Sequence, residues 1–75
     1  MGKKTRRLSN KLRELRQHHG GITQLDLANR VGVTRQTVIA IEANRYSPSL
    51  EVAFMIAQTL GVGIEDVFQF GGDTD

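Results

Sequence analysis

Gly32 separates two short segments in which apolar residues recur every three or four positions. Ala28 and Val31 precede the glycine, and Val38 and Ile41 follow it. Apolar residues at this spacing lie on one face of an α-helix, and a glycine between two helices permits the positive φ of a tight turn. Ala28 is small enough to let the second helix cross close to the first. The sequence therefore predicts two short helices that are joined by a tight turn and packed through these positions.

The other apolar and helix-breaking residues predict three further helices. Leu8, Leu12 and Leu15 form one stripe of a first helix at about residues 9–18. A fourth helix runs to Leu60, and a short fifth helix follows it. The residues expected to begin or end helices are Gly20 and Gly21, Thr23, Thr34, Ser47 or Ser49, and Gly61. The expected fold class is all-α, with five helices.

The composition indicates one small domain without thiol or metal chemistry. The chain has 75 residues, of which 39% are hydrophobic and 24% are charged, and it has no cysteine. His18 and His19 are adjacent, so they are poorly placed to ligate one metal from a helix face. The scattered carboxylates do not combine with them into a nucleophile, a base and an orienting group. We expect no enzymatic activity, no metal and no cofactor.

The net charge of +2 hides a strong division along the chain. Residues 1–45 contain all ten Lys and Arg residues and three acidic ones, which gives +7. Residues 46–75 contain five acidic residues and no basic one, which gives −5. This asymmetry favours a polyanion as the partner of the first part, although charge runs also occur on solvated surfaces. The expected organisation is a flexible basic arm at 1–7, a domain at 8–70 and a disordered tail at 71–75.

Several short motifs give the chain a resemblance to a known family. In order they are LRELR (12–16), TQLDLA (23–28), VGVTRQTV (31–38), IE (41–42), PSL (48–50), IA (56–57) and LGV (60–62). Together they resemble the Cro and phage-repressor-like helix-turn-helix domains, and in particular short single-domain transcriptional regulators. Each motif alone is weak, whereas their order and spacing together are specific. The resemblance implies a lambda-repressor-like fold with the helix-turn-helix at the second and third helices.

The same resemblance implies which residues contact DNA. The third helix would enter the major groove by its N-terminal end, where Arg35 suits a guanine edge and Gln36 an adenine edge. Gln24 matches the family's phosphate-contacting residue, and Arg16 with Glu42 matches a structural pair between the first and third helices. Taken singly, each residue also has a structural explanation. The expected DNA-binding residues are Gln24, Thr34, Arg35, Gln36, Thr37, Ile39, Ala40, Asn44 and Arg45.

Several features depart from the family's pattern, including a link from Arg16 to Thr23 that is one residue longer than usual. Ile39 occupies an outward position of the third helix that is usually polar, so it contacts either a thymine methyl group or a protein partner. The basic segment 3–7 is uncommon in such short regulators. It either follows a groove or phosphate track of DNA or serves as a solubilising tail.

The fourth helix is apolar on more than one face, which suggests a contact between two copies. Its expected inner stripe consists of Leu50, Ala53, Phe54, Ala57 and Leu60. Val52 and Met55 lie off this stripe and, with Phe68 and Phe70, form the expected dimer interface. The alternative is that Met55 is an ordinary surface residue. The alternation of residues 68–70 also suits a strand that pairs across the dimer.

These observations predict a cytoplasmic, sequence-specific regulator of transcription that binds double-stranded DNA. It would act as a homodimer on an inverted-repeat operator, as a repressor, and without a membrane contact. The alternative is an antitoxin or adaptor that binds a protein partner and binds DNA weakly. The segment after Phe70 is too short for a toxin-neutralising arm, which disfavours that alternative.

Overall fold

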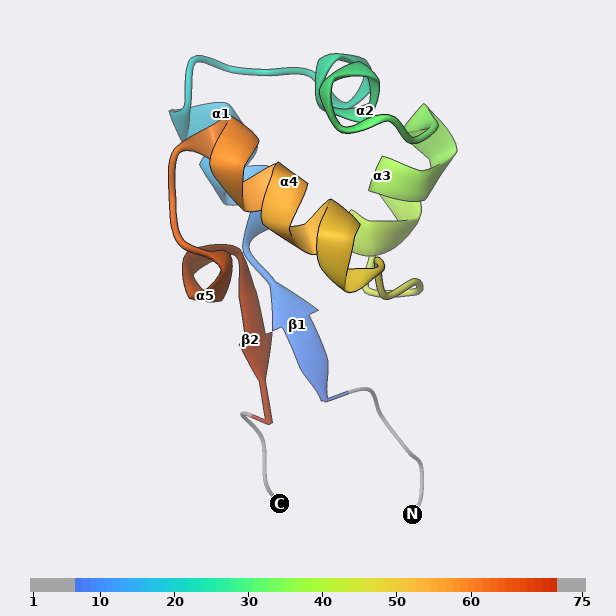
Figure 1. Ribbon diagram of the computed structural model, residues 1–75, viewed down its shortest axis with the longest axis vertical. Coiled ribbons are helices and arrows are strands. Elements are labelled where there is room, and N and C mark those ends of the chain that lie inside the picture. Colours follow the sequence, from blue (N-terminus) through green and yellow to red (C-terminus); the bar gives the residue numbers. More distant parts are fainter. Residues whose placement is uncertain (1–6, 72–75) are drawn as a thin grey trace.

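The computed structural model contains five helices and two short strands (Figure 1). It describes residues 7–71, so most of the basic arm expected at 1–7 and the tail expected at 71–75 lie outside the described residues. The five expected helices are confirmed. The elements are β1 (Leu8–Asn10), α1 (Leu12–His18), α2 (Gln24–Val31), α3 (Arg35–Glu42), α4 (Leu50–Leu60), α5 (Ile64–Val67) and β2 (Phe68–Phe70).

The tight turn between α2 and α3 has the predicted geometry. Gly32 ends α2 with a φ of 77°, in the left-handed region that glycine adopts without a steric cost. Thr23 begins α2 by accepting a hydrogen bond from the backbone of Asp26 at 3.0 Å. Thr34 begins α3 in the same way, with the backbone of Thr37 as donor at 3.1 Å. Both predicted N-caps are therefore confirmed, and they fix where α2 and α3 start.

One hydrophobic core joins α1, α2, α3, α4 and α5. In Figure 1, α4 crosses the centre of the view, and it packs against both α2 and α5. Every helix contributes at least one fully buried core side chain: Leu12, Leu27, Val38, Ile41, Ile56, Leu60 and Val67. The predicted inward positions of the α2–α3 pair are confirmed, because Ala28, Val31, Val38 and Ile41 all belong to this core.

The predicted inner face of α4 is partly wrong. Leu50 is 69% exposed and Phe54 is 48% exposed. The buried face of α4 turns instead toward α2 and α5, and it consists of Ala53, Ile56, Ala57 and Leu60. Because α4 is apolar nearly all round, its own periodicity does not decide which face is buried.

The all-α expectation is also wrong, because residues 8–10 and 68–70 form a small antiparallel sheet. β1 pairs with β2 in the register Leu8 with Phe70, Ser9 with Gln69 and Asn10 with Phe68. The first helix accordingly begins at Leu12 rather than Ser9. Residues 68–70 form a strand as expected, and within the chain this strand pairs with β1.

Asn10 explains why the strand stops and α1 begins there. Its Oδ1 accepts a hydrogen bond from the backbone of Leu12 at 3.0 Å, which satisfies an amide that the first turn of a helix leaves without a partner. Its Nδ2 donates to the carbonyl of Ile41 at 2.9 Å. The backbone of Lys11 also donates to the carbonyl of Val67 at 2.8 Å. The sheet is therefore tied to the C-terminal end of α3 and to α5.

Candidate nucleic-acid interface

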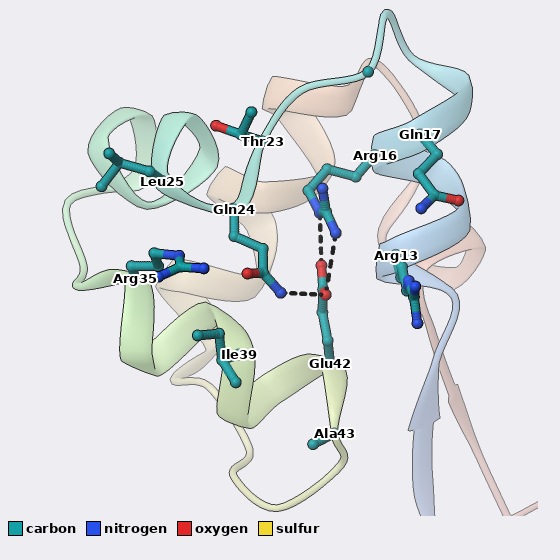
Figure 2. Close-up of a pocket in the computed structure, with 11 residues that line it drawn as sticks. Arg13, Arg16, Gln17, Thr23, Gln24, Leu25, Arg35, Ile39, Glu42 and Ala43 are labelled. Atoms are coloured by element: carbon teal, nitrogen blue, oxygen red, sulfur yellow. Dashed lines mark hydrogen bonds and ion pairs between the residues drawn. The ribbon is translucent and has the colours of Figure 1, made fainter.

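An open groove of about 660 Å³ lies between α1, the N-terminal part of α2 and the length of α3 (Figure 2). We call it the α1–α3 groove. Side chains from three helices surround it, so it depends on the packing of the whole domain. Its lining includes Arg13, Arg16, Gln17, Gln24, Leu25, Arg35, Ile39 and Glu42.

The inner wall of the groove is a buried, charge-neutral hydrogen-bond network. Arg16 Nε donates to Glu42 Oε2 at 2.7 Å, and Arg16 Nη1 donates to the carbonyl of Ile22 at 2.8 Å. Gln24 Nε2 donates to Glu42 Oε1 at 3.0 Å. The structural pair that the resemblance implied is thus present. Since these opposite charges neutralise each other, the groove's net charge comes from its rim.

The rim of the groove is positively charged. Arg13 on α1 and Arg35 on α3 are exposed, and both line the groove. Neither side chain forms an ion pair or a hydrogen bond within residues 7–71. Two uncompensated guanidinium groups beside one groove attract an anionic ligand.

The first turn of α3 presents two long polar side chains to solvent. The hydroxyls of Thr34 and Thr37 lie 3.0 Å apart and hydrogen-bond to each other, and Thr34 also caps the helix. Arg35 and Gln36 are exposed between them. Capping therefore occupies the two threonines, while Arg35 and Gln36 remain available for an external ligand.

Gln24 points into the groove from the start of α2. Thr23, not Gln24, caps this helix, and the Gln24 amide bonds to Glu42 on α3 (Figure 2). This bond orients the half-buried carboxamide toward α3. The first backbone amides of α2 have no partner within the helix, so they favour an anion nearby.

The other expected contact residues follow the exposed side of α3 to its end. Ile39 and Ala40 are half-buried in the second turn. Asn44 has a φ of 63°, a left-handed conformation that asparagine tolerates better than most residues. Its backbone donates to the carbonyl of Ile41 at 2.9 Å. This turn ends α3 and leaves Arg45 exposed directly after it.

The groove residues that were not anticipated from the sequence include Arg13, Gln17 and Leu25. Arg13 and Gln17 are four residues apart, so they share one side of α1, but only the packing of α1 brings that side to α3. The position of Leu25 in the sequence could have indicated its role. It is apolar and lies outside the buried stripe of α2, and it is 52% exposed.

The expected dimer residues differ in exposure. Val52, Met55 and Phe68 are half-buried and pack against the core of their own chain. Phe70 is 74% exposed at the end of β2. Each of the four retains some surface that a second copy could cover.

Residues 7–71 contain no cluster of three or more metal-ligating side chains. Within the same range, no helix is both long enough and apolar enough to cross a membrane.

Comparisons with known proteins agree with this geometry. The model of a helix-turn-helix family matches residues 12–67. A Methanocaldococcus jannaschii protein named as an uncharacterized HTH-type transcriptional regulator is 52% identical over 66 residues, which cover 88% of this chain and 98% of that protein. A Methanothermobacter thermautotrophicus protein named in the same way is 58% identical over 57 residues, which cover 72% of this chain and 83% of the relative.

A solved structure has a similar fold. It is the crystal structure of a hypothetical transcription factor, NHTF, from Neisseria, with a TM-score of 0.66 and 31% sequence identity. The match covers 73% of this chain and 62% of the Neisseria chain. Residues 12–67, which the family model matches, hold all five helices and the groove between them, and the chain belongs to the Cro/C1-type helix-turn-helix family.

Proposed function

We propose that this protein is a sequence-specific regulator of transcription that binds double-stranded DNA with α3 in the major groove. The observation that carries the proposal is the exposed pair Arg35 and Gln36 on the first turn of α3, beside a groove with a basic rim. A helix of this width fits the major groove, where each base pair presents a distinct set of donors and acceptors. The relatives' names as transcriptional regulators support the same function.

The proposed contacts divide into two groups. Arg35 reads guanine through O6 and N7, and Gln36 reads adenine through N6 and N7. Gln24, Asn44 and Arg45 contact phosphates, which fixes the register of the protein without reading sequence. Thr34, Thr37, Ile39 and Ala40 complete the surface of α3 that faces DNA.

We also infer that two copies act together on an inverted repeat. The interface would involve Val52, Met55, Phe68 and Phe70, which all keep exposed apolar surface. Two-fold symmetry would place the two α3 helices about 34 Å apart, one turn of DNA. A dimer bound across a promoter excludes RNA polymerase sterically, so we propose repression as the mode of regulation.

Selection from a random pool of double-stranded DNA tests this function. We expect enrichment of an inverted repeat, and an affinity for the enriched duplex that falls steeply as salt rises. The logarithm of the binding constant should fall by about 0.9 per phosphate contact for each unit of log salt concentration. The proposal would be contradicted if no sequence were enriched, or if the affinity did not change with salt concentration. A stable complex with a protein partner in place of DNA binding would support the adaptor alternative.

A further inference from the structure

Two apolar side chains line the α1–α3 groove although its rim is basic. Leu25 on α2 is 52% exposed, and Ile39 on α3 is half-buried. Neither belongs to the hydrophobic core or to the partly buried residues that pack against it. Their exposed surface therefore contributes nothing to the core, and a ligand would gain affinity by covering it with an apolar group.

Arg35 lines the same groove as these two side chains. Figure 2 shows the guanidinium group of Arg35 extending into the groove, with Leu25 on one side and Ile39 on the other. Arg35 and Ile39 are four residues apart and so are neighbours on the surface of α3. The groove thus combines a cationic fork with apolar surface on both sides of it.

Double-stranded DNA offers one matching pair of groups. Arginine binds guanine through O6 and N7, and the C5-methyl group of thymine is the apolar group on base edges of the major groove. A 5-methylcytosine presents the same methyl group at the same position. A methylated pyrimidine beside a guanine would therefore place a methyl group next to the guanidinium that binds the guanine.

We propose that Leu25, Arg35 and Ile39 together read a C5-methylated pyrimidine adjacent to guanine. Arg35 binds the guanine, and the two apolar side chains cover the methyl group. This inference rests on the proposed function and extends it from base identity to a methyl group. Removing one buried methyl group should weaken binding about three- to fivefold.

Substitutions of single bases in the DNA test the inference. The duplex enriched from the random pool is synthesised with uracil in place of each thymine in turn, because uracil lacks only the methyl group. We expect uracil to weaken binding about three- to fivefold at one thymine beside a guanine in each half-site, and less elsewhere. The same position is then made cytosine or 5-methylcytosine. Tighter binding to 5-methylcytosine than to cytosine shows that the site accepts the methyl group of either base. Equal binding to the two shows that the site accepts only the methyl group of thymine.

Protein variants assign the effect to the groove. In Leu25→Ala and Ile39→Ala, the ratio of thymine to uracil affinity should fall toward one. Leu50→Ala is the matched control, since Leu50 is 69% exposed on α4 and does not line the groove, and it should keep the full ratio. Thermal unfolding checks that all three variants fold.

Two results would overturn the inference while leaving the proposed function intact. One is an enriched site that contains no pyrimidine beside guanine or is insensitive to uracil at every thymine. The other is a uracil effect that persists unchanged in both groove variants, because the methyl group would then act through the shape of the DNA. Failure to enrich any sequence would instead overturn the proposed function itself.

Discussion

Arg16 on α1 and Glu42 at the end of α3 form an ion pair of 2.7 Å whose side chains are only 11% and 8% exposed. The same two side chains also bind the carbonyl of Ile22 and the amide of Gln24. One network therefore connects α1, the loop before α2, the start of α2 and the end of α3. It fixes the position of α1 beside α3, and with it the width of the α1–α3 groove.

Replacing Glu42 by alanine should strongly destabilise the domain. The variant would leave the Arg16 guanidinium buried with only the Ile22 carbonyl as a partner. Removing one member of a buried pair typically costs about 3–5 kcal/mol. Unfolding in urea, followed by circular dichroism, measures the free energy of unfolding.

The control is Glu51→Ala, which removes an exposed carboxylate from the first turn of α4. Its free energy of unfolding should change by no more than about 0.5 kcal/mol. A Glu42 variant as stable as this control would show that the ion pair contributes nothing to the packing of α1 on α3.

The α2–α3 pair was predictable because its signals are local. The caps Thr23 and Thr34 and the turn residue Gly32 each act on backbone within four residues. Such short-range chemistry is visible in sequence without knowledge of the fold.

The buried face of α4 and the first strand were not predictable in this way. Leu50 and Phe54 continue the apolar period of α4, so only the packing of α4 against α2 and α5 shows that they are outside. Leu8 likewise continues the leucine period of α1, while the partner that makes it a strand residue is Phe70, near the other end of the chain. The α1–α3 groove was not predictable for the same reason, since Arg13 and Leu25 come together beside α3 only in the folded domain.

Asn10→Ala should destabilise the junction between the sheet and α3. The substitution removes the hydrogen bonds to the Leu12 backbone and to the Ile41 carbonyl. Losing two partly buried hydrogen bonds should lower the free energy of unfolding by about 1–3 kcal/mol. Ser9→Ala, at an exposed position of the same strand, is the control and should be close to wild type. Equal stability of the two variants in urea would show that Asn10 does not hold the sheet in place.

Arg35→Ala and Gln36→Ala should relax the sequence preference of DNA binding. Both side chains are exposed on the first turn of α3, so their removal leaves the fold intact. A bidentate contact to a base contributes about 1–3 kcal/mol of discrimination. Competition between the enriched duplex and single-base variants of it measures this loss. An unchanged preference in both variants would place base reading elsewhere on the protein.

Gln24→Ala and Arg45→Ala should instead weaken binding to all sequences alike. Both residues are proposed to contact phosphates, which carry no sequence information. The Arg45 variant should also reduce the salt slope by about one, because one cationic contact is lost. Gln24→Ala removes an uncharged group, so its salt slope should stay near that of the wild type. Loss of sequence preference in either variant would contradict the assignment of α3 as the recognition helix.

Met55→Lys should shift the protein from dimer to monomer. Met55 lies half-buried on α4, and a lysine there can direct its ammonium group to water while its aliphatic stem covers the core. The charge would then lie within the proposed interface, where it loses hydration on association. Sedimentation equilibrium should report a lower mass, and affinity for the inverted repeat should fall toward that for a half-site. The control is Phe54→Lys, which changes an exposed aromatic residue of the same helix and should leave the mass unchanged. If a normally folded Met55→Lys variant also keeps the wild-type mass, Met55 does not lie in the interface.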